Sequence, residues 1–513
     1  MAIIWKKKEA LRCDFNVPAD TIPGWYHLQT KTIGQHAITK SLFVFENGVL
    51  AGYYLPKKEL RKIATLTLRA VLENPTRIDR VHKRATDLNW QYFRFAEKIR
   101  KLDLTKLTNR QLLKLHSRLF RLQMLSHCYA QPTTWFVDSD GNDLTNYLMN
   151  FLKRRIQATR ERLDFAAAFS ILTTPSRITL GSQEEKESLQ ILEWIQKQAK
   201  VKNWFLAKNR SPLSQKFTQL PAAARSKLYR HYYKWTWLPY AYTGPPYSLD
   251  YYLDVWRGLL RERVNPQKEI KGKSQQALET RRRHAVLFKK LKFSGYEKKL
   301  FDTAADIVWL KGFRKDCYFH GFFVLVLILA EIGKRTGLAL KQVKFLLPLE
   351  LPLALRGKDL TNLVNERINF SLLYGVKGRI KALSGRAAHV FLKKFRFQRE
   401  RRESFGGKLF GTCACPGAAR GAVRIVNYPE EMGRMKSGDI MLATQTYPSL
   451  VPAMKKAAAI VTEEGGLTCH AAIVSRELKI PCIVGIKGLL TFLKDGDRIE
   501  VDANKGVVRK VLV

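Results

Sequence analysis

The segment TEEGGLTCHAAIVSRELKIPCIVG, residues 462–485, runs from a glycine-containing loop into an apolar stretch at helical spacing and then into a short β-branched run. The preceding AAIVT at 458–462 predicts a strand, and residues 469–478 predict a helix. The loop EEGGLT therefore joins a strand to a helix, and His470 falls in the first turn of that helix. Backbone N–H groups in a first turn have no intrahelical partner. This segment predicts an α/β fold that places a histidine at a helix N-terminus.

The loop before His470 suits a bound phosphoryl group. Gly465 and Gly466 leave the backbone open to close approach, and a helix N-terminus attracts anions. Thr468 is expected to cap the helix or to bind phosphoryl oxygens, and Arg476, two turns along, is a source of positive charge. A neutral imidazole can be the nucleophile that forms a covalent phosphoryl intermediate. The alternative is a histidine that only caps or packs, which is the commoner role of a single histidine.

The alternation of short strands and helices continues through the whole C-terminal part of the chain. This alternation predicts a compact α/β domain over residues 405–513. The pair Gly406-Gly407 lies behind a charge run and predicts a flexible hinge. Strands are expected at 421–426, 438–444, 458–462, 481–486 and within 497–513, and helices at 448–457 and 469–478.

Residues 462–485 resemble the phosphohistidine segment of the phosphoenolpyruvate-utilising enzymes, which include phosphoenolpyruvate synthase, pyruvate phosphate dikinase and rifampicin phosphotransferase. The stretch GTCACPGAARGAVRIV at 411–426 resembles the opening of the same domain. The resemblance implies a swivelling β/β/α domain that carries a phosphorylated histidine between two distant sites, with His470 as that histidine. Cys469 departs from the pattern, where Ser is common. The residues that fit the pattern are Gly465, Gly466, Thr468, His470, Ala471, Ala472, Arg476, Ile480, Pro481 and Gly485.

The resemblance also implies donor domains that the sequence does not display. In this family the histidine receives phosphate from ATP on an ATP-grasp domain or from phosphoenolpyruvate on a TIM barrel. Neither is recognisable here, no G-x-x-x-x-G-K-[ST] loop is present, and no barrel is expected beyond Val513. We therefore expect Mg²⁺ with ATP or phosphoenolpyruvate at a donor site in trans, on a separate ATP-grasp or other phosphate-donor protein. We expect a small-molecule acceptor, no firmly bound cofactor and no metal site.

The remainder of the chain is expected to be mainly helical. Long segments at helical spacing dominate residues 56–404. Before them, residues 1–55 form a small element in which SLFVFENGVLAGYY at 41–54 predicts a β-hairpin that turns at Asn47-Gly48. Residues 268–388 resemble the helical domain of rifampicin-phosphotransferase-like proteins through an Arg-rich helix, an E-x-G-x-R turn and a final L-S-G. The expected fold class is multidomain, with an α region followed by an α/β domain.

Positive charge is concentrated in the N-terminal region. The chain has 90 Lys+Arg and 44 Asp+Glu, a net charge of +46. Residues 405–513 hold 15 basic and 10 acidic residues, which leaves 75 basic and 34 acidic residues, a net +41, on residues 1–404. Such a field attracts nucleic acid, anionic membranes or phosphorylated ligands. A host whose proteins are generally basic gives the same composition, and both explanations stay open.

The sequence predicts a cytoplasmic protein. The longest apolar run, at 321–330, is shorter than the roughly 20 residues of a membrane span and predicts a buried helix. The N-terminal residues do not have the pattern of a secretory signal. The seven cysteines are scattered along the chain and do not predict a disulfide framework. The favoured function is a phosphotransferase component that carries a phosphoryl group on His470 and is incomplete without a nucleotide-binding partner. The alternative is a non-catalytic polyanion- or RNA-binding protein that retains the swivelling domain.

Overall fold

The computed structural model describes residues 3–8, 15–138, 141, 143–207, 212–240, 244–398, 408–446, 450–466 and 469–511. The hinge glycines Gly406 and Gly407 lie outside these ranges, as does Thr468. Contacts divide the chain into two compact units. The first unit joins residues 1–155 to 294–406, and the second joins 156–293 to 407–513.

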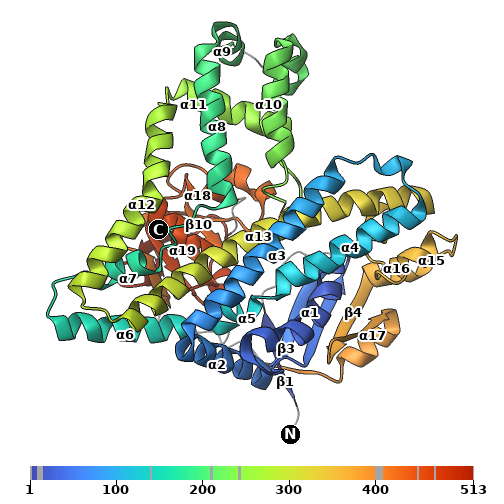
Figure 1. The fold of residues 1–513 in the computed structure, drawn as a ribbon, viewed down its shortest axis with the longest axis horizontal. Helices are drawn as coiled ribbons and strands as arrows, with labels where there is room; N and C mark the ends of the chain where they lie inside the picture. The colour runs from blue at the N-terminus through green and yellow to red at the C-terminus, as the bar shows by residue number, and fades with distance from the viewer. Residues whose placement is uncertain are drawn as a thin grey trace. The chain divides into compact units, whose positions relative to one another are not determined.

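A long helix, α13 (Gly295–Thr336), forms the centre of the first unit (Figure 1). It packs against α3 (Pro75–Arg100) and α4 (Asn109–Cys128). Ser294 and Glu297 form a capping box at its start, and Gly337, at φ 71°, ends it. The buried helix predicted at 321–330 is confirmed inside α13. This helix is long and apolar enough to cross a membrane, but 78% of its most apolar window is buried inside the protein.

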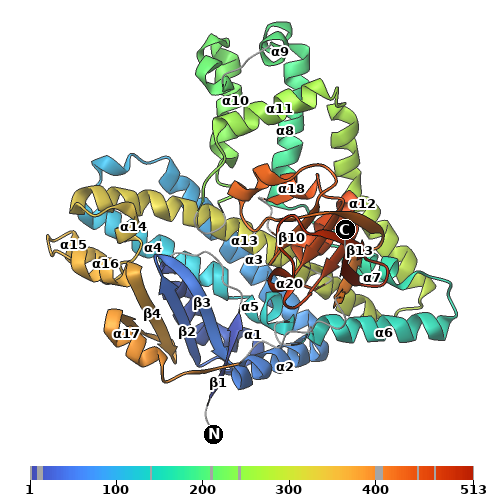
Figure 2. The same ribbon diagram turned by 180° about the vertical axis from the view of Figure 1, so that it is seen from behind.

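Six strands of the first unit form one sheet, in the order β5-β4-β2-β3-β1-β6. The predicted hairpin is confirmed, because β2 (Lys40–Glu46) pairs with β3 (Val49–Pro56) around Asn47 at φ 53° and Gly48 at φ 82°. On its other edge β2 pairs with β4 (Phe370–Val376), which lies beside it in Figure 2. Residues 1–55 are therefore not a separate element, contrary to expectation. The remaining strands are β1 (Ile4–Lys8), β5 (Arg379–Ser384) and β6 (Arg396–Phe397).

Shorter helices complete the first unit and build the second. The first unit also contains α1 (Asn16–Ile33), α2 (Lys57–Glu73), α5 (Gln131–Thr134), α14 (Leu340–Val343), α15 (Leu351–Ala354), α16 (Thr361–Asn369) and α17 (Gly385–Leu392), and α6 (Asp143–Thr159) crosses the boundary. The helical part of the second unit has α7 (Phe165–Thr173), α8 (Leu180–Lys197), α9 (Ala199–Leu206), α10 (Ala222–Trp235), α11 (Leu249–Arg261) and α12 (Pro266–Lys290).

The C-terminal domain is an eight-stranded sheet in the order β7-β14-β13-β9-β10-β11-β12-β8. The four strands β9 to β12 run parallel, and antiparallel strands flank them. The helix predicted at 469–478 forms almost in full, whereas only four residues of the helix predicted at 448–457 are helical. The expected combination of an α region with an α/β domain is confirmed. The elements are β7 (Lys408–Phe410), β8 (Thr412–Cys415), β9 (Ala418–Ile425), β10 (Ile440–Ala443), α18 (Val451–Met454), β11 (Ala459–Thr462), α19 (His470–Leu478), β12 (Cys482–Val484), α20 (Leu489–Phe492), β13 (Arg498–Asp502) and β14 (Val507–Lys510).

Candidate functional site

His470 is the first residue of α19, as the sequence predicts. Its Nδ1 atom lies 2.7 Å from the hydroxyl Oγ1 of Thr446, whose residue is only 4% exposed. His470 begins the helix that follows β11, and Thr446 lies in the loop that follows β10. The strands β10 and β11 are adjacent and parallel. The carboxyl ends of such strands share one edge of a sheet, where ligands commonly bind. One ring nitrogen is therefore held by a buried hydroxyl, which fixes the orientation of the imidazole.

The glycine loop before α19 has a conformation that requires glycine. Gly465 adopts φ +113°, and an added Cβ would lie 2.7 Å from the Sγ of Cys469. Gly466 accepts a hydrogen bond at its carbonyl from the Cys469 N–H, at 3.0 Å. The cap position itself is taken by Cys469, whose Sγ accepts from the Ala472 N–H at 3.5 Å. The predicted capping role of Thr468 is thus filled by its neighbour.

Arg476 points to the strand beside its helix. Its Nε donates to the carbonyl of Ala414 on β8 at 2.8 Å. Burial lowers the pKa of its guanidinium from the ordinary value, and the neighbouring thiols oppose this effect. Arg476 therefore helps to attach α19 to β8, and its predicted contact with a phosphoryl group stays a prediction.

Four cysteines lie near Arg476 of α19. Cys482 on β12 is directly opposite Cys415 on β8, and Cys413 and Cys469 lie nearby in the field of Arg476. Burial raises the pKa of the Cys482, Cys415 and Cys413 thiols. These thiols are therefore uncharged near neutral pH. Over the part of the chain that the structure describes, no group of three or more His, Cys, Asp or Glu side chains is arranged to hold a metal ion.

Sequence reasoning missed Thr446. It lies in the stretch TQT, three residues after the end of β10, and 24 positions before its partner histidine. The available signal was positional, because a polar residue that follows a buried strand lies at the same sheet edge as the loop after the adjacent parallel strand. Recognising it requires the order of β10 and β11 in the sheet, which residue spacing does not reveal.

An open groove of about 630 Å³ lies in the first unit between α16 and α17. Arg386 and His389 line it from α17, Lys393 lines it just after that helix, and Glu366 of α16 also lines it. The His389 ring stacks on Phe370 with centroids 3.8 Å apart. Arg386 and Lys393 are exposed and make no ion pair among the described residues. A groove of this size that carries two unpaired cations is suited to an anionic small molecule.

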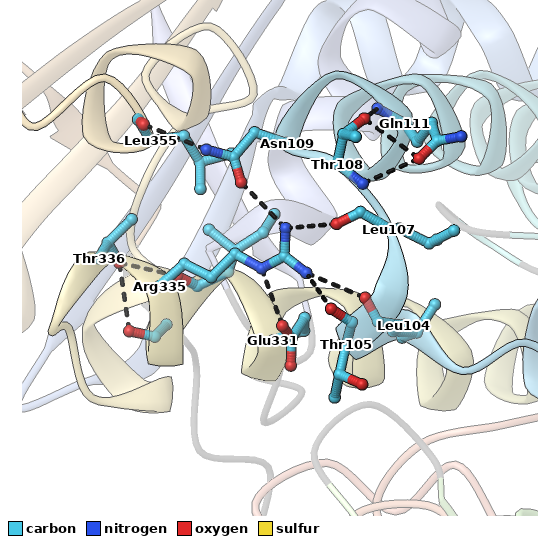
Figure 3. Close-up of polar contacts among 12 residues, drawn as sticks. Leu104, Thr105, Leu107, Thr108, Asn109, Gln111, Glu331, Arg335, Thr336 and Leu355 are labelled. Atoms are coloured by element: carbon cyan, nitrogen blue, oxygen red, sulfur yellow. Dashed lines mark hydrogen bonds and ion pairs between the residues drawn. The ribbon is translucent and has the colours of Figure 1, made fainter.

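The E-x-G-x-R turn at the end of α13 has a structural role. Arg335 donates to the carbonyls of Leu104, Thr105 and Leu107 at 3.0, 3.2 and 2.7 Å. It also contacts Glu331 at 2.8 Å, and Figure 3 shows the guanidinium between α13 and the loop that joins α3 to α4. This network fixes the α3–α4 connection. The likeness of residues 268–388 to a rifampicin-phosphotransferase-like helical domain stays a prediction.

Comparison with known proteins places the C-terminal domain. Residues 435–506 match the family described as "PEP-utilising enzyme, mobile domain". A probable phosphoenolpyruvate synthase of Archaeoglobus fulgidus is 46% identical over 134 residues, which is 26% of this chain and 18% of that protein. Phosphoenolpyruvate synthase of Pyrococcus furiosus is 51% identical over 105 residues, which is 20% of this chain and 13% of that protein.

A bacterial relative shows the same pattern. Phosphoenolpyruvate synthase of Pseudomonas aeruginosa is 34% identical over 134 residues, 26% of this chain and 16% of that protein. The matched stretch thus covers less than a fifth of each of these three relatives. The resemblance of the C-terminal domain to the phosphoenolpyruvate-utilising enzymes is confirmed, and the activity of the whole synthases is not transferred with it.

Proposed function

We propose, for a chain whose C-terminal domain is a mobile domain of the phosphoenolpyruvate-utilising enzymes, that His470 carries a phosphoryl group between a donor and an acceptor. The observation that supports this most is the contact of 2.7 Å between Thr446 Oγ1 and His470 Nδ1 at the start of α19. When Nδ1 holds the proton, it donates to the threonine hydroxyl. The lone pair of the ring is then on Nε2, which is the nucleophile.

The chemical step transfers one phosphoryl group. The Nε2 lone pair attacks the phosphorus of the donor, an N–P bond forms, and the donor's P–O bond breaks with its electron pair leaving on oxygen. Thr446 keeps the Nδ1 proton in place while positive charge develops on the ring. An acceptor oxygen later attacks phosphorus, and the N–P electron pair returns to Nε2. The protein acts as a transferase of phosphorus-containing groups in this proposal.

The loop residues support the phosphoryl group in two ways. The N–H groups in the first turn of a helix have no intrahelical carbonyl partner, and the helix dipole favours negative charge at the start of α19. The conformation of Gly465 at φ +113° keeps a side chain out of this space. Gly466 and Thr468 belong to the same loop and complete the proposed phosphoryl site.

The donor and the acceptor are further parts of the proposal. A separate ATP-grasp or other donor protein in the cytoplasm would bind Mg²⁺ with ATP or phosphoenolpyruvate and supply the phosphoryl group to His470. The groove beside α17 is the proposed acceptor site, because Arg386 and Lys393 provide unpaired positive charge for an anionic small molecule. Movement of the domain about Gly406-Gly407 would bring His470 to each site in turn.

The test is a labelling experiment on the full chain. The protein is incubated with Mg²⁺ and either ATP or phosphoenolpyruvate labelled in each phosphate, with and without a cell extract, and acid-labile label is located by mass spectrometry. Label is expected on His470 and is expected to disappear in His470→Ala. His36→Ala is the matched control, because it removes an exposed histidine of the first unit that does not line the proposed acceptor groove. Absence of label, or equal label on His470→Ala, refutes the proposal.

A further inference from the structure

Two neighbouring helices of the first unit expose many cations. We define the α3–α4 basic face as eleven exposed residues: Arg77, Arg80, Lys83, Arg84, Arg94, Lys98 and Lys101 from α3 and its end, and Arg110, Lys114, Arg118 and Arg121 from α4. Among the residues that the structure describes, none of the eleven takes part in an ion pair.

The acidic residues of this hairpin do not neutralise the face. Residues 75–128 contain only four acidic side chains. Asp79 is paired with Lys299, Glu97 contacts Arg100 and the buried His320, and Asp103 pairs with Lys106. Only Asp87 remains, so the face holds a large uncompensated positive charge.

The cations form two parallel rows. On α3 and its end the cations share one helix face in two groups, residues 77–84 and 94–101, and the nine residues between the groups include the exposed Asp87. On α4 the residues Arg110, Lys114, Arg118 and Arg121 recur every three or four residues, which is the spacing of one helix face. The guanidinium of Arg118 lies 4.6 Å from the centroid of the Phe95 ring on α3, so the row of α4 lies beside that of α3. A helix of 26 residues is about 39 Å long, and packed helices lie about 8 to 10 Å apart.

This surface is rigid before it meets a partner. Both helices pack against α13, and Arg335 holds the loop between them by hydrogen bonds to three of its carbonyls (Figure 3). The helices cannot slide past one another without breaking that network. The cations are therefore preorganised, and binding orders only their side chains.

We infer that the α3–α4 basic face binds the phosphate backbone of a nucleic acid duplex. Two long rows of unpaired Lys and Arg match the two rows of phosphates that border a groove, and their binding releases condensed counterions. Phe95 and Phe120 are half-buried, and within the described part of 75–128 the only large apolar side chain that is prominently exposed is Leu102. The face thus offers neither aromatic platforms for unpaired bases nor the apolar row that inserts into a membrane.

The backbone mode of recognition has a quantitative signature. Six to eight phosphate contacts predict that affinity falls about 10³-fold or more between 50 and 200 mM salt. Sequence selectivity is expected to be small, because phosphate contacts carry no base information. This inference does not depend on phosphoryl transfer by His470.

The test measures binding of the full chain to a 20-base-pair duplex by fluorescence anisotropy across a salt series, with RNA and DNA duplexes of the same sequence. The variant combines Arg94→Ala, Lys98→Ala, Lys114→Ala and Arg121→Ala. It is expected to reduce the slope of log affinity against log salt by about 3 to 4, and to weaken binding by at least about 30-fold at 100 mM salt. Circular dichroism confirms that the variant is folded.

The matched control removes the same charge from another helix. Lys268, Lys271, Lys289 and Lys290 on α12 are exposed and make no ion pair within the described part of the chain. Their fourfold change to Ala is expected to weaken binding by less than about 3-fold, and His470→Ala is expected to have no effect. An equal loss in both fourfold variants would overturn the inference, as would salt-insensitive binding, no binding at 50 mM salt, or binding to anionic phosphatidylserine vesicles without duplex binding. Binding of RNA alone, DNA alone or both supports it.

Discussion

The C-terminal domain and the α3–α4 basic face differ in how many of their cations have acidic partners. The C-terminal domain pairs six of its cations, whereas others, such as Lys455, Lys456 and Lys487, have no ion pair among the described residues. In the mobile domain, Arg420 and Arg509 both contact Glu500 at 2.8 Å, and Lys510 contacts Asp497 at 2.9 Å. On the basic face, none of the eleven cations has an acidic partner among the described residues. Since one host made both regions, a generally basic proteome explains the total charge but not its placement. The difference in placement is what the two proposals require, with phosphoryl transfer assigned to one region and duplex binding to the other.

Charge that is used for structure should be costly to remove, and Arg335 tests this expectation. Arg335→Ala removes the guanidinium hydrogen bonds to three backbone carbonyls and to Glu331, and only the Leu104 carbonyl keeps another donor, the Leu107 N–H, among the hydrogen bonds of the described residues. We expect a loss of about 3 to 4 kcal/mol in the free energy of unfolding, measured by denaturant titration. Arg110→Ala, on the basic face, is the control and should change stability by less than about 0.5 kcal/mol. A loss below about 1 kcal/mol in Arg335→Ala would remove the contrast.

The C-terminal domain is expected to carry out phosphoryl transfer, and a substitution at Thr446 tests this step separately from duplex binding. Thr446→Val removes the hydroxyl that orients His470, so we expect the initial rate of phosphohistidine formation to fall about 100-fold. Thr446→Ser should restore most of the rate, and duplex binding should stay unchanged. Thr444→Val is the control, since Thr444 lies just after β10 and the hydrogen bonds seen for it are made by its backbone N–H and carbonyl, which valine keeps. An unchanged rate in Thr446→Val contradicts the positioning role.

Asp20 is an acid that does not neutralise any cation while its carboxyl is protonated, so its pKa affects the charge balance of the first unit. Asp20 on α1 is fully buried, and burial raises its pKa from 3.8 to about 7, against the hydrogen bonds from Gln123, Thr21 and Tyr318. Below about pH 4 it is protonated in both the folded and the unfolded state. Between about pH 4 and 7 only the unfolded state loses the proton, so the free energy of unfolding falls as pH rises.

The variant Asp20→Asn should lack this dependence. We expect the wild type to lose on the order of 3 kcal/mol relative to the variant between pH 4 and 7, and the difference to become constant once Asp20 is ionised in both states at higher pH. Urea titrations of both proteins across this range give the measurement. Parallel pH profiles for the two proteins would show that Asp20 is ionised in the folded state.

The smallest effect is expected where surface cations are already paired. Glu500→Gln, on β13, releases Arg420 on β9 and Arg509 on β14, the two strands that flank it. Exposed pairs contribute little, so we expect a stability loss below about 1 kcal/mol that shrinks further in high salt. Duplex affinity should not rise measurably, because two released cations do not make a row. A clear gain in duplex affinity would show that any unpaired cation of this chain suffices.

Local sequence signals predicted the surroundings of His470 well. The glycine pair and the helical spacing after it are contained within 462–485, and the strand, loop and helix form there as expected. Thr446 was missed because its contact depends on which strands are neighbours. The N-cap of α19 is Cys469, one residue after the predicted Thr468, because residue spacing alone defines the start of a helix only to within one or two residues.

Long-range pairings were the least predictable part of the fold. The strand β4 lies within residues 56–404, for which the sequence predicts a mainly helical region, and its partner β2 lies near the N-terminus. The net charge of +41 on residues 1–404 was evident from counting. Its concentration on α3 and α4 was not, because ion pairs such as that of Asp79 with Lys299 depend on packing.

The pairing of β2 with β4 also sets an order of events during synthesis. Lys40 pairs with Val376, so the ribosome must add the whole stretch between them before the strand can find its neighbour. At 5 to 20 residues per second this takes on the order of 20 to 70 s. During that interval β2 presents an unprotected edge in the nascent chain, and such edges promote aggregation. The abundant like charge of the emerging N-terminal segment keeps nascent chains apart until β4 arrives.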